Sequence, residues 1–215
     1  MKYRCLIFDH DDTIVNSSAT IHYPCFVEFM QKFHPDQYYS LEDFMRYHFE
    51  VGFVSFYKDI CGFSDGELDF EHRYWLEYTK NHCAEAFPGI REIMEDHKAQ
   101  GGKLAVVSHS DSVNIEKDFK YNDLPDPDII LGYDTSECEI KPSPMPVVRI
   151  MERFRLKPEE VLVIDDMKPG YLMAKAAGVS FAAAGWCFDI PANTAFMQEN
   201  ADFYCRRVRD LAKLL

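Results

Sequence analysis

Short apolar runs without alternating polar positions recur along the chain and predict strands that are buried on both faces. Four such runs have the length and β-branched content of strands: RCLIFD from residue 4, KLAVVS from 103, DIILG from 128 and VLVID from 161. Segments with apolar residues at helical spacing separate them, such as GIREIMEDHKAQGG, MPVVRIMERFRLKPEE and GYLMAKAAGV. This alternation predicts an α/β fold with a doubly wound parallel sheet.

Residues 17–86 have a different pattern. Three amphipathic, aromatic-rich segments follow one another there, and none of them has the period of a strand: IHYPCFVEFMQKFH, LEDFMRYHFEVGFVSFYKDICG and DGELDFEHRYWLEYTKNHCAEA. The turn formers of FPGI, residues 87–90, mark the return to the α/β pattern. We therefore expect a core domain formed by 1–16 and 87–215, with a helical bundle, 17–86, inserted after the first strand.

Composition narrows the possible partners. The net charge of −13 argues against a nucleic-acid partner, because phosphate backbones are bound by Lys and Arg. No apolar stretch approaches the roughly 20 residues of a membrane span, and the N-terminus runs into a strand without a signal-peptide pattern. The seven cysteines are scattered and form no CxxC, which is typical of free thiols in a reducing compartment. We expect a cytoplasmic protein with no membrane partner, and the sequence leaves its oligomeric state open.

Polar side chains gather where the predicted strands end. The ends carry carboxylates and a hydroxyl: Asp9, Asp11, Ser108, Asp165 and Asp166. Lys141 stands in EIKPSP, a proline-flanked segment between the third and fourth strands. Ligands of open parallel sheets bind beyond the carboxyl ends of the strands. We therefore expect these groups to lie together at that edge of the sheet, which we call the rim.

Magnesium-assisted phosphoryl transfer is the chemistry that uses such a set. Mg²⁺ is a hard ion that takes oxygen ligands, and clustered Asp side chains supply them. A carboxylate can attack phosphorus and form an aspartyl-phosphate, while a second carboxyl protonates the leaving group and later activates water. An ammonium and a hydroxyl would bind the phosphoryl oxygens.

These residues make the chain similar to the haloacid dehalogenase superfamily of phosphotransferases over essentially its whole length. The four motifs of that superfamily correspond to FDHDDT, the Ser that closes LAVVS, the Lys of IKPSP and the acidic pair of VLVIDD. The insert resembles the helical C1 cap of the superfamily. The resemblance implies a Rossmann-like α/β core with a cap domain.

The resemblance also implies roles for the carboxylates. Asp9 would be the nucleophile and a magnesium ligand. Asp11 would be the general acid and base, and would also bind the metal through its backbone carbonyl. Asp166 would be the third protein ligand, and Asp165 would hold metal-bound water. Because superfamily members that dehalogenate have no acid at the position of Asp11, this residue favours phosphate-ester chemistry.

Four further residues are implied to contact the phosphoryl group. Ser108 and Lys141 would bind it, and Lys141 would also orient Asp9. His10 and His109 adjoin motif residues, and their backbone N–H groups are expected to face the phosphoryl oxygens. Taken alone, each histidine side chain is more often packed or solvent-facing.

The chain departs from the superfamily pattern at two positions. Asp12 replaces the usual Gly, and we interpret it as a substitute in a left-handed backbone position, which Asp tolerates better than most residues. Gly170 stands where many members carry a further Asp, and Asp165 is expected to take over that supporting role.

The leading hypothesis is therefore a Mg²⁺-dependent phosphatase that acts on a small phosphorylated metabolite, of the phosphoglycolate type or a sugar phosphate. One alternative is a phosphosugar mutase similar to β-phosphoglucomutase; such mutases carry a His early in the cap where this chain has Ile21, with His22 one residue later. Another alternative is a non-catalytic binding protein of the same fold. Candidate substrate contacts in the insert are His22, Arg46, His48, Lys58 and Arg73.

Overall fold

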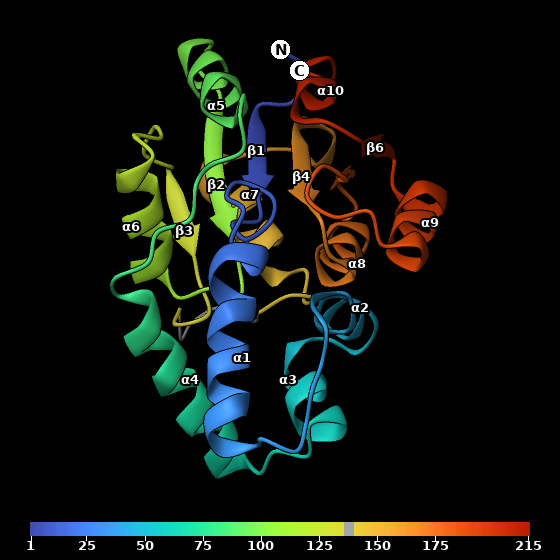
Figure 1. The fold of residues 1–215 in the computed structure, drawn as a ribbon. Helices are drawn as coiled ribbons and strands as arrows, with labels where there is room; N and C mark the ends of the chain where they lie inside the picture. Colours follow the sequence, from blue (N-terminus) through green and yellow to red (C-terminus); the bar gives the residue numbers. More distant parts are fainter. Residues whose placement is uncertain (136–139) are drawn as a thin grey trace. The chain divides into compact units, whose positions relative to one another are not determined.

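The structure is a computed structural model that describes residues 1–135 and 140–215 (Figure 1). The chain forms two compact units. One, the core unit, combines Met1–Asn16 with Glu85–Leu215, and the other, the helical unit, is Ser17–Ala84. The second junction thus lies two residues before the position that the sequence pattern indicates. Each unit is described by itself below.

A six-stranded parallel sheet forms the centre of the core unit. Its strands are β1 (Cys5–Phe8), β2 (Lys103–Val107), β3 (Ile129–Leu131), β4 (Val161–Asp165), β5 (Ser180–Ala184) and β6 (Phe203–Cys205). The spatial order is β3-β2-β1-β4-β5-β6, and Figure 1 shows β2, β1 and β4 running side by side in one direction. Cys5 pairs with Lys103 on one side and Val161 on the other. The predicted α/β class and parallel sheet are confirmed.

The sheet has two strands that the apolar pattern did not predict. β5 reads SFAAA, and alanine has a low preference for strands, so this run resembles a continuation of the preceding helix. β6 has only three residues and lies at the sheet edge. β5 was missed because its strand propensity is weak, and β6 because three residues are too few to show a pattern.

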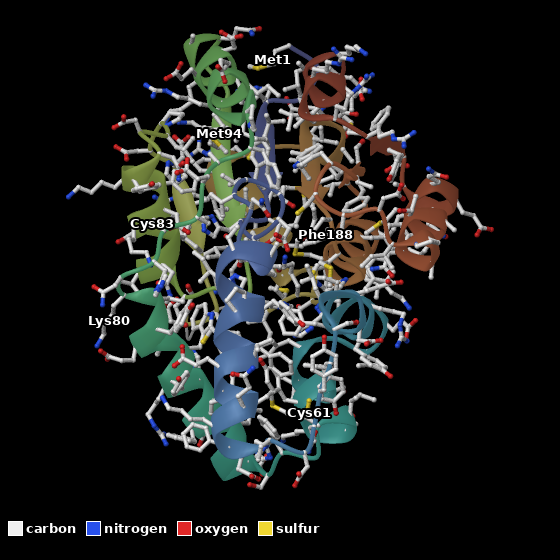
Figure 2. The ribbon with its side chains drawn as sticks, in the orientation of Figure 1. Met1, Cys61, Lys80, Cys83, Met94 and Phe188 are labelled. Carbon is white, nitrogen blue, oxygen red and sulfur yellow. The ribbon has the colours of Figure 1, made fainter. Side chains whose placement is uncertain are left out.

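Helices lie between the parallel strands along the chain, and one more follows β6. They are α5 (Ile90–Ala99), α6 (Ser112–Tyr121), α7 (Met145–Phe154), α8 (Lys168–Ala177), α9 (Pro191–Asn200) and α10 (Val208–Ala212), with a short η3 (Pro158–Glu160) before β4. The predicted stop of α8 is confirmed, because Gly178 has a left-handed backbone with φ 72°. Met94 of α5 is fully buried, and its side chain is marked in Figure 2. The three helices predicted in this unit are all present.

The helical unit contains no strand among its residues, all of which the structure describes. Its elements are η1 (Ser18–His22), α1 (Tyr23–Phe33), α2 (Leu41–Val51), α3 (Phe53–Ser55), η2 (Phe56–Ile60) and α4 (Asp65–Thr79). Ser40 and Ser64 begin α2 and α4 with capping boxes, in which hydroxyl and carboxylate satisfy the first N–H groups. Gly52, with φ 84°, separates α2 from α3. The second predicted helical segment is therefore interrupted at this glycine.

Aromatic rings fill the helical unit between its helices. Phe26 lies 5.1 Å from Phe44 and 5.5 Å from Phe56, measured between ring centroids. Tyr57 donates a hydrogen bond of 3.0 Å to the buried carboxyl of Glu71. Burial raises the pKa of Glu71 to about 7, and the Tyr57 hydroxyl offsets part of this effect. This packing accounts for the buried aromatic residues of the insert, whereas Phe33, Tyr38 and Phe70 are exposed.

Two further expectations bear on the whole chain. Six cysteines are free thiols, at positions 5, 25, 61, 83, 187 and 205, whereas Cys138 lies outside the described residues. Within residues 1–135 and 140–215, no helix has the length and apolar character needed to cross a membrane.

Candidate active site

The loop after β1 carries the first two candidate carboxylates and turns back on itself. The Asp9 N–H donates to the Ile164 carbonyl at 2.8 Å, which holds the start of the loop against β4. Asp12 has φ 57° and its N–H donates to Val15 at 2.7 Å. The predicted left-handed backbone at Asp12 is confirmed. This conformation lets the chain turn directly after Asp11.

The sheet order explains why this loop meets the end of β4. The chain leaves β1 toward β2 and β3 on one side and later returns to place β4 on the other side. The carboxyl ends of β1 and β4 are therefore the switch point, where ligands of doubly wound sheets bind. The strand ends bring Asp9 next to Asp165 and Asp166, with one carboxylate oxygen from each lying within 4.8 Å of the others.

Lys141 is clamped between two carboxylates. Its Nζ donates to Asp9 Oδ1 at 2.8 Å and to Asp165 Oδ2 at 2.7 Å, and all three side chains are buried. Burial by itself would lower the pKa of Lys141, but the adjacent Asp165 and Asp9 raise it above its ordinary value. The lysine is therefore held in its charged form. Lys141 thus contacts Asp9 directly, and its role in orienting this carboxylate stays a prediction.

Gly170 makes the position of the Asp165 carboxylate possible. A Cβ built on Gly170 would lie 2.0 Å from Asp165 Oδ2, well inside van der Waals contact. The other oxygen of Asp165 accepts a hydrogen bond of 2.7 Å from the Met167 N–H. The glycine in the first turn of α8 thus leaves the space that Asp165 fills, which explains why the two residues occur together.

Asp166 faces the loop after β1. The Thr13 hydroxyl donates to Asp166 Oδ1 at 3.2 Å and so ties this loop to the end of β4. Burial raises the pKa of Asp166 well above its usual range, and the charge of Asp12 adds to the effect. A bound divalent cation would reverse that direction, because it favours the charged carboxylate. This crowding of buried acids is the electrostatic setting that a cation stabilises.

Asp11 is held by two hydroxyl groups from the loop after β2. Its Oδ2 accepts a close hydrogen bond from the Ser110 hydroxyl and a long one, 3.5 Å, from the Ser108 hydroxyl. Ser108 thus lies beside Asp11 at the rim, as its position after β2 predicts. Ser110 was not identified from sequence, where SHSDS offered several serines that could equally cap the following helix.

The side chains of the two candidate histidines, His10 and His109, hydrogen-bond to other parts of the core unit. His10 is buried, and its Nε2 donates to Asp118 Oδ2 of α6 at 3.1 Å. His109 Nε2 lies 3.1 Å from the Lys141 carbonyl and must be the donor, because a carbonyl only accepts. Burial lowers the pKa of His109 to about 4, and nearby Lys141 contributes to the shift. His10 therefore links the loop after β1 to α6, and His109 links the loop after β2 to the backbone at Lys141. The orientation of their backbone N–H groups stays a prediction.

A second loop that sequence reasoning missed follows β5. Trp186 Nε1 donates to the Thr13 carbonyl at 3.2 Å, and Cys187 Sγ donates to Asp12 Oδ1 at 3.5 Å. Figure 2 marks this loop at Phe188. Had β5 been recognised as a strand, the same rule that identified the other rim residues would have pointed to this loop.

Four of the five candidate contacts in the helical unit have recorded partners within that unit. Trp75 Nε1 donates to His22 Nδ1 at 2.9 Å. Arg46 pairs with Asp43 and Glu50 along α2. The remaining candidates have these environments: Lys58 pairs with Asp65, His48 contacts the Phe44 carbonyl through Nδ1, and Arg73 is exposed. The structure of this unit assigns a local role to four of the five.

Comparison with known proteins places the chain in a family. The model of the haloacid dehalogenase-like hydrolases matches residues 6–184, which include every candidate site residue. The chain belongs to the haloacid dehalogenase-like hydrolase family. The predicted resemblance is confirmed, and so is the prediction of an enzyme of the hydrolase class.

Individual relatives cover the whole chain at low identity. The pyrophosphatase PpaX of Bacillus cereus (strain Q1) is 25% identical over 220 residues, which span 100% of this chain and 97% of the relative. A haloacid dehalogenase-like hydrolase of Bacteroides fragilis has a TM-score of 0.82 at 24% identity and covers 98% of this chain and 100% of its own. A predicted phosphoglycolate phosphatase of Haemophilus somnus has a TM-score of 0.79 at 19% identity, covering 100% and 98%. These structures confirm the fold.

Proposed function

We propose that the protein is a Mg²⁺-dependent phosphatase that hydrolyses a small phosphorylated metabolite through an aspartyl-phosphate. The observation that carries the proposal is the placement of Asp9 at the switch point of the sheet. There it lies against the ammonium of Lys141 and beside the carboxylate of Asp166, two residues before the second acid, Asp11. The proposed nucleophile Asp9, the ammonium of Lys141 and the proposed proton-transfer group Asp11 thus lie at the same edge of the sheet.

The donor set supports a divalent cation at this rim. Asp9 and Asp166, with Asp165 next to them, supply carboxylate oxygens within reach of a single ion, and hard oxygen ligands are those that Mg²⁺ selects. Asp9 and Asp166 would hold the ion, because Asp165 already accepts hydrogen bonds from Lys141 and the Met167 N–H. When bound, the ion would supply charge stabilisation to the phosphoryl oxygens.

The residues of the chain can carry both halves of the hydrolysis. An Asp9 carboxylate oxygen attacks phosphorus, the bond from phosphorus to the leaving oxygen breaks, and Asp11 gives its proton to that oxygen to form the free alcohol. In the second half Asp11 takes a proton from water, whose oxygen attacks phosphorus. The bond to Asp9 then breaks, inorganic phosphate leaves, and both carboxyl groups return to their starting state.

Lys141 serves the same reaction as a fixed positive charge. It neutralises part of the charge on Asp9 before the attack and faces the phosphoryl oxygens when the new bond forms. Because Asp165 and the carbonyl contact of His109 hold the lysine on both sides, little reorganisation is needed during the reaction.

The helical unit is proposed as a cap that excludes bulk water from the rim. Its two ends leave the core unit next to each other, since the Asn16 N–H donates to the Glu85 carbonyl at 2.9 Å. A unit joined to the core through two adjacent connecting segments can open and close as one body.

Free thiols at the six described cysteines support the prediction of a reducing, cytoplasmic location.

The names of relatives support a small, anionic substrate. PpaX is a pyrophosphatase, and the Haemophilus somnus protein is described as a predicted phosphoglycolate phosphatase. A solved relative, CbbY of Rhodobacter sphaeroides, is in complex with xylulose-(1,5)-bisphosphate. We propose a substrate of the same size, such as a phosphoglycolate-type compound or a sugar phosphate.

The residue at position 21, near the beginning of the helical unit, favours hydrolysis over a mutase reaction. Ile21, at the position where the mutases carry a His, is 4% exposed and offers no proton donor. Incubation with a hexose 1-phosphate separates the two activities, because a phosphatase releases free phosphate whereas a mutase forms the 6-phosphate without it.

A phosphate-release screen tests the proposal. Wild type, Asp9→Asn and the surface control Asp96→Asn are compared on pyrophosphate, a phosphoglycolate-type ester and sugar phosphates, with Mg²⁺ and with EDTA. We expect release by wild type and the control only with Mg²⁺, and none by Asp9→Asn. Equal turnover by Asp9→Asn, or turnover unaffected by EDTA, would contradict the mechanism.

A further inference from the structure

The loop after β2 presents a hydroxyl to Asp11 that the four family motifs do not include. Ser110 is buried, with 4% of its surface exposed, and its hydroxyl donates to Asp11 Oδ2. The Ser108 hydroxyl approaches the same oxygen only at 3.5 Å. Of the two serines, Ser110 therefore makes the shorter contact with the Asp11 carboxyl.

The backbone around Ser110 is fixed from both sides. Its N–H donates to the Ser108 hydroxyl at 3.1 Å, and its carbonyl accepts from the Tyr133 N–H at 3.0 Å. Gly132 permits this close approach, because a Cβ there would lie 2.8 Å from the Ser110 carbonyl oxygen and 2.7 Å from the Ser112 N–H nitrogen. The backbone that carries the Ser110 hydroxyl is thus held in place by hydrogen bonds and close packing.

We propose that Ser110 is a positioning residue for Asp11 that sets which of its carboxyl oxygens transfers the proton. This inference rests on the proposed phosphatase function. Because Oδ2 accepts hydrogen bonds from hydroxyl groups, the proton that Asp11 gives to the leaving oxygen is carried by Oδ1. Rotation of the carboxyl would exchange the two oxygens, and the Ser110 hydroxyl resists that rotation. Among the residues that the structure describes, the Ser110 hydroxyl donates to Asp11 and not to Asp9 or Asp166.

A comparison of substrates with good and poor leaving groups can reveal whether Ser110 positions Asp11 for proton transfer. An alcohol that is a poor leaving group needs the proton of Asp11 as its bond to phosphorus breaks, whereas p-nitrophenolate leaves readily without one. The ratio kcat/KM reports all steps through departure of the leaving group. Loss of Asp11 orientation should therefore lower kcat/KM for an alkyl phosphate more than for p-nitrophenyl phosphate.

The experiment compares wild type, Ser110→Ala, Ser110→Thr and the control Ser112→Ala on p-nitrophenyl phosphate and glycerol phosphate. Ser112 is the first residue of α6, directly after the same loop, and its hydroxyl donates to the carboxylate of Asp134 at 2.9 Å, so its removal deletes a similar hydrogen bond away from Asp11. We expect Ser110→Ala to lose about tenfold more kcat/KM on glycerol phosphate than on p-nitrophenyl phosphate. The Thr variant should restore the wild-type ratio, and the control should keep it.

Three results would overturn the inference. Equal losses on both substrates would show a merely structural role for Ser110, and an unchanged or increased rate on glycerol phosphate would show that the hydroxyl does not assist Asp11. Absence of phosphate release by wild type from both substrates and from every ester of the screen described above would overturn the proposed function as well. The two failures are therefore distinguishable in the wild-type measurement.

Discussion

Replacing Gly170 by Ala adds a single methyl group and tests the arrangement in which Lys141 lies between Asp9 and Asp165. The new Cβ would stand 2.0 Å from Asp165 Oδ2 and 2.1 Å from its Cγ, so the carboxylate must move by about 1 Å or more. Lys141 Nζ, now 2.7 Å from that oxygen, would lose this hydrogen bond and keep its contact with Asp9. The substitution thus unpairs Asp165 without touching either member of the pair.

The size of the effect follows from two opposing contributions. Breaking a buried ion pair costs about 3 to 5 kcal/mol, and the retained Asp9 contact places this case at the lower end. Alanine in place of glycine stabilises a helix by about 1 kcal/mol. The free energy of unfolding should therefore fall by about 2 kcal/mol, which a domain stable by about 5 to 15 kcal/mol survives. Because Lys141 would lose the Asp165 contact that fixes its position, kcat/KM should fall by about 10²-fold.

Denaturant unfolding and phosphatase kinetics measure the two quantities. Gly66→Ala is the matched control, because Gly66 also lies in the first turn of a helix, α4, and a Cβ there meets no atom within 4 Å. The control should be as stable as wild type or slightly more stable, with unchanged kcat/KM. If Gly170→Ala behaved like the control in both measurements, the proposed steric coupling of Gly170, Asp165 and Lys141 would be refuted.

Three further predictions follow from individual residues. Asp12→Ala should be less stable to urea than Asp12→Gly by about 1 to 2 kcal/mol, because both remove the carboxylate and only Gly adopts φ 57° without strain; equal stability would contradict this. Because the pKa of Glu71 is about 7 in the folded unit against 4.5 in its ordinary state, its contribution to stability declines by about 3 kcal/mol as pH rises from 4.5 to 7. Glu71→Gln should remove this part of the pH dependence of unfolding, and an unaltered slope would argue against a buried, protonated carboxyl. Mg²⁺ at about 100 times its dissociation constant should stabilise wild type by about 2.7 kcal/mol, and Asp166→Asn should lose most of this gain; an equal gain in the variant would exclude Asp166 as a ligand.

The residues at the rim could be predicted because two simple rules coincide there. Unalternating apolar runs identify buried parallel strands, and the residue after each run lies at the carboxyl edge of the sheet. Asp9, Ser108 and Asp165 follow from these rules alone. The left-handed backbone of Asp12 could also be predicted, because the superfamily that the chain resembles usually has Gly at this position and Asp is among the few other residues that tolerate this conformation.

The support around these residues depends on contacts between distant segments, which no local pattern reports. Ser110 is one of several serines in SHSDS, and only the position of Asp11 across the rim distinguishes it. Trp186 and Cys187 follow a strand that is rich in alanine and is held in place by its neighbours in the sheet. The space beside Asp165 is likewise set by the packing of α8, and the sequence shows only that residue 170 is a glycine.

Trapping of the phosphorylated intermediate tests the central claim most directly. Asp11→Asn is mixed with p-nitrophenyl phosphate and Mg²⁺, quenched in acid and digested, and the peptides are analysed by mass spectrometry. We predict one added phosphoryl group on the peptide that contains Asp9, at Asp9 itself, and none when Asp9→Asn is combined with Asp11→Asn. Phosphate release by wild type together with no phosphoryl group on Asp9, or with one on another residue, would contradict the account.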